Sequence, residues 1–207
     1  MEKIPIGTKR ISLKEYEMPT APELNQSQIN RVSKCLSDTR NENRDRAYFF
    51  TLLFTGMRVS EALKLSIGDV IDADGVFKDS TIIHKTKNGK SGRIYFPKAL
   101  QKYLKPYLKE RNSMLNEALF CSNQSKGTSM SVVNATRLIK KAFLNAGLEG
   151  YSSHSCRRTF AYTLCHKHQT NLSLLCSLLR HESVKTSMLY MKASTLEAKG
   201  AVSNLKF

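Results

Sequence analysis

The chain has 207 residues, of which 41% are hydrophobic, and this composition favours a globular core over a disordered chain. Lysine and arginine total 33 against 17 aspartate and glutamate residues, a formal net charge of +16 that predicts a polyanionic partner. No apolar run approaches the roughly 20 residues of a membrane span, and the N-terminus lacks the apolar core of a signal peptide. We therefore expect a cytoplasmic protein that binds nucleic acid rather than a membrane; the alternative is a basic surface without a specific role.

The five cysteines are odd in number and scattered, and no two of them form a CxxC pair. This pattern is neither a disulfide framework nor a zinc site. We expect each cysteine to act as a small buried hydrophobe, and we expect no metal and no cofactor.

The first half of the chain predicts an arm or linker over residues 1–20, followed by helices. Proline in a first turn starts a helix at about residue 20 that runs to about Ser37. Residues 46–54 are apolar nearly all round, which predicts a buried central helix ended by Gly56. A short helix over 60–63 follows.

Two strand-like runs, 81–84 and 93–96, flank the turn signal Asn88-Gly89 and predict an antiparallel hairpin. Residues 119–121 read as one more short strand. Helical patterns follow at about 98–111, 130–146, 155–168, 171–179 and 183–191. The sequence therefore predicts a mainly α protein with a small antiparallel β-sheet, an α+β fold with one domain over residues 21–192.

Histidine and arginine residues from both halves of the chain suit the binding of phosphate. His154 and Arg157 are three residues apart at the start of a predicted helix, where free N–H groups favour an anion. The alternative interpretation is a capping histidine and a surface arginine. Arg58 follows the buried helix, and its planar guanidinium could bind two phosphate oxygens; a salt bridge to Glu61 is an alternative compatible with that role.

Lys87 lies in the predicted hairpin turn, where a lysine could donate a proton to a leaving oxygen, although Lys85 and Lys90 are close competitors. Tyr190 follows His181 by nine residues. A tyrosine has a pKa of about 10 and needs nearby positive charge to act as a nucleophile. Its alternative role is that of a half-buried packing residue.

These residues resemble the tyrosine recombinases of the phage integrase family, over about residues 22–192. Five segments stand in the order and spacing of the family motifs: Thr55–Leu63 with the first arginine, Thr86–Pro97 with the hairpin lysine, His154–Ala161 as the HxxR motif, Leu178–His181, and Tyr190. The resemblance implies the catalytic-domain fold of that family. It also implies a site-specific recombinase, that is, an integrase, invertase or resolvase.

The resemblance implies six catalytic residues: Arg58, Lys87, His154, Arg157, His181 and Tyr190. The two arginines would clamp the scissile phosphate, and the two histidines would donate hydrogen bonds to it. The lysine would protonate the 5′-hydroxyl leaving group, and the tyrosine would form a 3′-phosphotyrosine link without a metal. Implied partners are double-stranded DNA with specific recombination sites and a homotetramer assembled on it; accessory DNA-bending proteins are allowed.

The sequence departs from the family pattern at several places. Arg180 stands where glycine usually precedes the histidine, and we expect the arginine to be tolerated if its side chain faces solvent or DNA. Arg158 adds a positive charge after the second arginine. Only about 20 residues precede the match, as in minimal members such as the fimbrial phase-variation invertases, or as in a shortened form of a longer protein. Residues 193–207 form a tail that docks on a neighbouring protomer; the alternatives are a tail that folds on its own domain or is disordered.

Two other functions share some of these features. A type IB topoisomerase-like enzyme uses similar residues, and a DNA-binding regulator could keep the recombinase fold without catalysis. The presence of all six candidate residues argues against the regulator.

Overall fold

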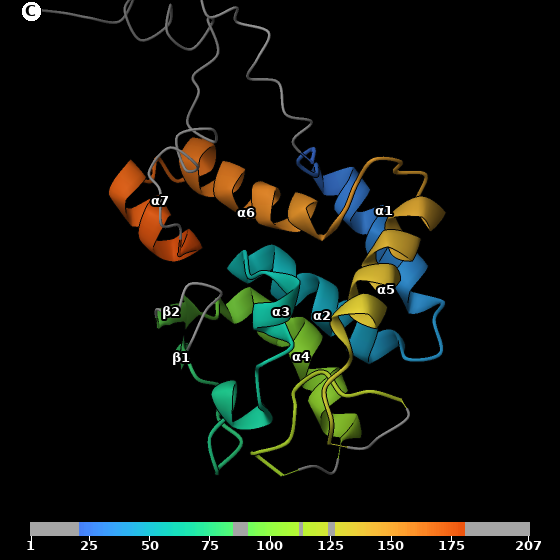
Figure 1. The fold of residues 1–207 in the computed structure, drawn as a ribbon, viewed down its shortest axis with the longest axis vertical. Helices are drawn as coiled ribbons and strands as arrows, with labels where there is room; N and C mark the ends of the chain where they lie inside the picture. Colours follow the sequence, from blue (N-terminus) through green and yellow to red (C-terminus); the bar gives the residue numbers. More distant parts are fainter. Residues whose placement is uncertain (1–20, 85–90, 112–113, 124–126, 181–207) are drawn as a thin grey trace, which may run out of the picture.

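The computed structural model describes residues 21–84, 91–111, 114–123 and 127–180 (Figure 1). The predicted arm over 1–20 and the predicted helix over 183–191 lie outside these ranges. The described elements are α1 (Gln26–Ser37), α2 (Glu42–Thr55), α3 (Val59–Ala62), β1 (Ser80–Ile83), β2 (Gly92–Tyr95), α4 (Lys98–Glu110), α5 (Val132–Asn145), α6 (Ser153–Lys167) and α7 (Leu172–Leu179), with a 3₁₀ turn over Ile67–Asp69. The predicted fold class is confirmed.

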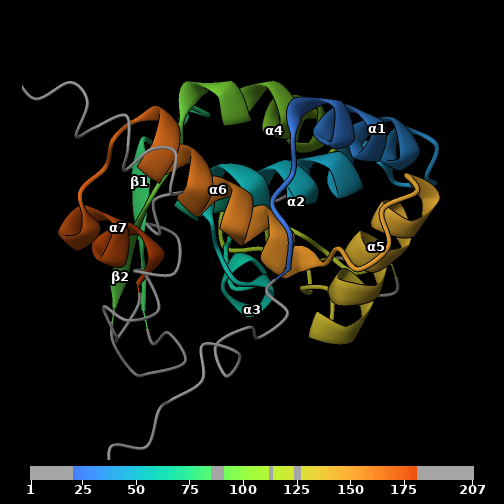
Figure 2. The ribbon, with the colours of Figure 1, turned by 90° about the horizontal axis from the view of Figure 1, so that it is seen from above.

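Helix α2 is the centre of the core, as the apolar run of residues 46–54 predicts. Buried side chains lie on all of its faces, and Tyr48, Phe49 and Leu52 are completely buried. Helices α1, α4 and α6 each pack against it, which encloses it in a helical layer (Figures 1 and 2). Helix α2 is therefore the fixed element against which helices α1, α4 and α6 are positioned.

Helix α1 begins later than the sequence predicts, because a capping box fixes its start. The Asn25 side chain accepts a hydrogen bond from the Gln28 backbone N–H at 2.9 Å. The Gln28 side chain accepts in return from the Asn25 N–H, also at 2.9 Å. These two bonds satisfy N–H groups that lack a partner within the helix, so residues 21–25 remain outside it, although Leu24 is buried as part of the core.

The predicted hairpin is confirmed by the antiparallel pair β1 and β2, whose register pairs Ser80 with Tyr95 and Ile83 with Gly92. The predicted strand over 119–121 is wrong. Ala118 and Cys121 form only isolated bridges, with Ser66 and Ser129 respectively. No neighbouring segment continues either bridge into a ladder, so this apolar run is buried as irregular chain. None of the helices within the described residues has the length and apolar character that crossing a bilayer requires.

Gly56 ends helix α2 for two separate reasons. Its φ of +59° is a left-handed conformation that favours glycine. A Cβ at this position would also lie 2.4 Å from the Cδ1 atom of Phe160 on helix α6. The glycine therefore ends α2 and allows α6 to pack closely across its end.

We expect Gly56→Ala to lower the free energy of unfolding by about 2–4 kcal/mol, because it adds a close contact to the backbone strain. Gly75→Ala is the matched control, since Gly75 also has a positive φ, of +77°, but no atom lies within 4 Å of its added Cβ. Urea unfolding of both variants measures the difference. Equal losses would show that the Phe160 contact contributes nothing.

Candidate active site

Arg58 lies directly after the end of α2 and begins helix α3. Its Nη1 atom is 2.8 Å from Glu61 Oε1, and its backbone N–H donates to Glu61 Oε2 at 2.9 Å. The salt bridge considered from the sequence is therefore confirmed. The Arg58 side chain remains 29% exposed, so a ligand in solvent can reach it while Glu61 is buried beneath it.

Arg157 is buried within helix α6, and its guanidinium bridges the ends of two other helices. Nη1 donates to the carbonyl oxygen of Gly56 at 2.5 Å, and Nη2 donates to the carbonyl oxygen of Leu179. The alternative interpretation as a surface arginine is wrong. Since Gly56 is two residues before Arg58, this bond places the second arginine beside the loop that carries the first.

His154 lies in the first turn of helix α6 and is exposed. It is not the capping residue that the alternative interpretation assumed. Ser152 caps the helix: its hydroxyl accepts from the His154 N–H at 3.3 Å, and its N–H donates to the Ser155 hydroxyl at 3.1 Å. The histidine side chain is thus left accessible at a helix N-terminus, three residues from Arg157.

Arg180 does not meet the condition under which we expected it, from the sequence, to be tolerated, a side chain that faces solvent or DNA. That side chain is only 6% exposed, and its Nη2 atom lies 2.8 Å from Glu61 Oε2. The residue ends α7 in a left-handed conformation with φ of +54°. The side chain runs from this residue to the buried carboxylate of Glu61. The motifs do not predict the pairing of Arg180 with Glu61. They do not show that the backbone of Arg180 is left-handed, and so they do not show where its side chain lies.

The Glu61 carboxylate forms salt bridges with Arg58 and Arg180, and these two partners keep it ionised. Burial alone would raise the pKa of Glu61, but the charge of Arg180 and the hydrogen bonds from Arg58 and Arg180 outweigh it and keep the pKa below its ordinary value of 4.5. The carboxylate is therefore ionised at neutral pH.

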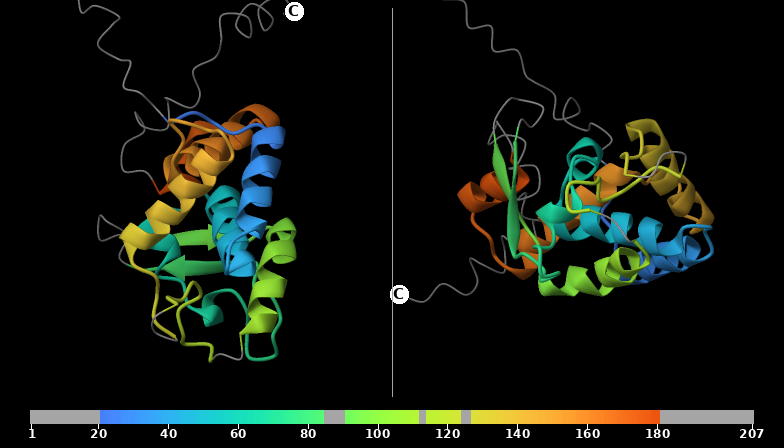
Figure 3. Two further views of the ribbon diagram at one scale, coloured as in Figure 1. Left: turned by 90° about the vertical axis from the view of Figure 1, so that its right-hand side faces the viewer. Right: turned by 90° about the horizontal axis from the view of Figure 1, so that it is seen from below.

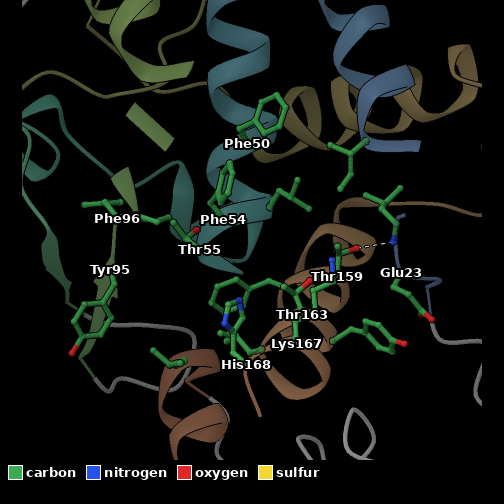
Figure 4. Close-up of a pocket in the computed structure, with 18 of the residues that line it drawn as sticks. Glu23, Phe50, Phe54, Thr55, Tyr95, Phe96, Thr159, Thr163, Lys167 and His168 are labelled. Atoms are coloured by element: carbon green, nitrogen blue, oxygen red, sulfur yellow. Dashed lines mark hydrogen bonds between the residues drawn. The ribbon is translucent and has the colours of Figure 1, made fainter. Parts of the chain in front are cut away.

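Arg158, the other departure from the family pattern, is paired with an acid from the start of the described chain. Its Nε atom lies 3.0 Å from Glu23 Oε2. The neighbouring Thr159 hydroxyl accepts from the backbone N–H of Leu24 at 2.7 Å (Figure 4). The charge that Arg158 adds is thus partly offset, and the segment before α1 is attached to α6.

A large apolar cavity lies beside this attachment. Its volume is about 1180 Å³, and side chains of α1, α2, α4, β2 and α6 line it, including the labelled Phe50, Phe54 and His168 (Figure 4). The cavity is adjacent to the arginine cluster, since Arg180 is one of its lining residues.

Lys87, His181 and Tyr190 lie outside the described residues, and so do the competitors Lys85 and Lys90. The elements that precede or flank them are described. The strand pair on either side of the Lys87 segment lies next to α7, which ends just before His181 (Figures 2 and 3). The described chain therefore brings together the elements that carry the first arginine, the HxxR motif and the Leu178–Arg180 segment, with the base of the hairpin beside them.

Comparison with known proteins gives a consistent result. The model of the phage integrase family matches residues 22–197. The tyrosine recombinase XerC of Caldanaerobacter subterraneus subsp. tengcongensis is 30% identical over 181 residues, which is 84% of this chain and 49% of that protein. The chain thus spans about half the length of the curated relatives it matches.

Two solved structures have similar folds. A XerH site-specific recombinase bound to palindromic difH substrate, in a post-cleavage complex, matches with a TM-score of 0.70 and 27% identity, over 88% of this chain and 52% of that one. The XerA recombinase matches with a TM-score of 0.71 and 21% identity, over 92% of this chain and 66% of that one. The second likeness concerns the fold alone.

We expect Glu61→Gln to be destabilising by about 2–4 kcal/mol at neutral pH, because it leaves the buried Arg180 without its anionic partner. A carboxyl whose folded pKa is lowered stabilises the protein above the ordinary pKa of 4.5 and loses this effect as the pH falls through the folded pKa. The difference in unfolding free energy between wild type and variant should therefore shrink below about that pH. Denaturant unfolding over a pH series measures it, and Glu149→Gln, at an exposed carboxyl, should show no such difference.

Proposed function

We propose that this chain, which belongs to the phage integrase family, is a site-specific recombinase that cuts and rejoins DNA through a 3′-phosphotyrosine link at Tyr190. The observation that carries the proposal is the bond from Arg157 to the Gly56 carbonyl. It holds Arg157 beside the loop that carries Arg58, although the two arginines are distant in sequence.

The proposed reaction has two displacements at one phosphorus atom. In the first, the Tyr190 hydroxyl oxygen attacks, the bond to the 5′ oxygen breaks, and Lys87 gives its proton to that oxygen. In the second, a 5′-hydroxyl gives its proton to Lys87 and attacks the phosphotyrosine. The bond from phosphorus to the Tyr190 oxygen breaks, and that oxygen takes up a proton again. The phosphodiester energy is conserved in the covalent link, so rejoining requires no ATP.

The described arginines suit the stabilisation of the transition state. Arg58 is partly exposed, so a phosphate can reach it where it lies. Arg157 is buried and donates to two carbonyl groups, so it would offer a phosphate only its remaining N–H groups. Preset donors of this kind stabilise the extra negative charge that develops on phosphate oxygens. His154 and His181 would add hydrogen bonds, with His154 helping to deprotonate Tyr190.

The substrate that we propose is double-stranded DNA with specific recombination sites. The XerH relative is described as bound to a palindromic substrate after cleavage, which supports this choice. The curated relatives are named as tyrosine recombinases, so the topoisomerase-like enzyme and the regulator without catalysis are less favoured. A steep salt dependence of binding is expected in any case from the charge of +16.

We extend the proposal to the assembly. A homotetramer on DNA would bring two sites together, with accessory DNA-bending proteins as further partners. Residues 193–207 lie outside the described residues. In the sequence they contain Leu196, Ala198, Val202 and Leu205, which we propose form an apolar edge. We propose that this edge docks on a neighbouring protomer, and the apolar cavity between α2, α4 and α6 offers a surface of the right chemistry.

The covalent link can be tested with a nicked duplex, whose sequence is first obtained by selecting bound duplexes from a random pool. The wild-type protein should form a covalent adduct that survives denaturation. Tyr190→Phe should form none, because it lacks the attacking oxygen. Tyr162→Phe is the control, since Tyr162 is an exposed tyrosine of α6 outside the motifs. An adduct that persists in Tyr190→Phe, or no adduct in the wild type, would refute the proposal.

The docking of the tail can be tested with substitutions of opposite character. Val202→Asp with Leu205→Asp places charge on the apolar edge and should lower the population of two-site complexes about tenfold or more, because burying an unpaired carboxylate is costly. Binding to a duplex with one site should stay within about threefold, as those residues are not proposed to contact DNA. Ser203→Asp should leave both measurements unchanged. Equal two-site assembly by all three proteins would show that the tail does not dock.

A further inference from the structure

Arg180 occupies a position whose backbone and burial both disfavour arginine. Its φ of +54° is left-handed, a conformation that suits glycine, and its side chain is only 6% exposed. Burying a charged side chain without a partner costs free energy and destabilises the folded protein. The surroundings of this residue therefore have to compensate for both features.

The carboxylate of Glu61 is shared between Arg180 and Arg58. Arg180 Nη2 lies 2.8 Å from Oε2, while Arg58 Nη1 lies 2.8 Å from Oε1. Arg180 Nη1 also donates to the Leu178 carbonyl at 2.7 Å, which fixes the guanidinium from its own helix end. Arg180 therefore occupies the buried side of the carboxylate, and Arg58 occupies the side nearer solvent.

This arrangement changes what Arg58 can offer a ligand. With Arg58 as its sole partner, Glu61 would neutralise that arginine, and a phosphate would have to compete with a buried carboxylate for it. With Arg180 present, the three side chains together carry one positive charge. This net positive charge is accessible to a ligand at Arg58, whose side chain is 29% exposed.

The aliphatic part of Arg180 makes a second, steric connection. A Cβ at position 92 would lie 2.5 Å from Arg180 Cδ and 2.9 Å from its Cγ. Gly92 does not have a positive φ, so the glycine is needed there for space and not for backbone conformation. Gly92 begins strand β2. The side chain of Arg180 thus lies across the base of the hairpin that carries Lys87.

We propose that Arg180 is a positioning residue for the reaction: it holds Glu61 from the buried side so that Arg58 remains available to the scissile phosphate, and it seats strand β2 against α7 through Gly92. This rests on the proposed recombinase function. It gives Arg180 a role within the protein and no contact with DNA.

The electrostatic part is tested by comparing Arg180→Lys with Arg180→Met. Both keep an unbranched side chain over Gly92, but only lysine keeps the charge beside Glu61. We expect Arg180→Met to slow adduct formation on the nicked duplex about tenfold or more, and Arg180→Lys to remain within about threefold of wild type. The dissociation constant for the intact duplex should change less than about threefold in both, because Arg180 does not touch DNA.

A merely structural role would make the two variants equally slow or equally active, and either result would overturn the electrostatic part. Thermal melting of each variant shows that it is folded. Absence of any adduct in the wild type would instead refute the recombinase function, so the two failures can be told apart.

The steric part is tested without any DNA. Gly92→Ala should lower the melting temperature by about 4 °C or more when Arg180 is present, because the added methyl meets a side chain held at both ends. In an Arg180→Gly background the same substitution should cost much less. If an Arg180→Gly protein fails to fold, Arg180→Ala provides the same shortened background. An equal loss in both backgrounds would show that Gly92 and Arg180 are not coupled.

Discussion

The buried guanidinium of Arg157 joins the C-terminal ends of two helices, and the candidate site depends on this junction. Gly56 and Leu179 provide carbonyl groups at the ends of α2 and α7 that have no acceptor role within their own helices. Helix C-termini carry partial negative charge and favour a cation. Without this arginine, α6 would lose its polar connection to both helices, and the loop that carries Arg58 would lose its nearest fixed neighbour.

The two candidate phosphate-binding arginines are held in different ways, and the difference suits different roles. Arg157 is bound by rigid backbone groups, so its direction is set before any ligand arrives. Arg58 is bound by a side chain, Glu61, that is itself held from behind by Arg180. One arginine is therefore fixed by the fold, and the other is adjustable within a cluster that retains positive charge. A phosphate that enters such a site meets Arg58 partly exposed and already held by Glu61, so that donor needs little reorganisation.

Hydrophobic periodicity and capping signals predicted most of the helices, because burial of α2 and of one face of α4 and α5 dominates the local choice. The Asn25 capping box and the irregular run over 119–121 were missed, since both depend on which partners tertiary packing supplies. The motif spacing predicted that Arg58 and Arg157 belong to one site. It did not place the Arg180 side chain, whose burial depends on a left-handed backbone and on the space at Gly92. Neither can be seen from the identity of residue 180.

Among the described residues, the arginines Arg44 and Arg111 differ from the lysines of α4 in the contacts that they make. Arg44 and Arg111 each bind a carboxylate and a backbone carbonyl, as the planar guanidinium allows. Lysines on α4 instead lie exposed along one face: Lys98, Lys102, Lys105 and Lys109. Composition alone could indicate a polyanionic partner, because exposed positive charges attract a polyanion without any particular arrangement of side chains. The motif spacing indicated the reaction, and the fold adds which arginines are buried and which carboxylate they bind. Because Arg180 is proposed to act on Arg58 through Glu61 and not to touch DNA itself, its substitution is expected to affect cleavage more than binding.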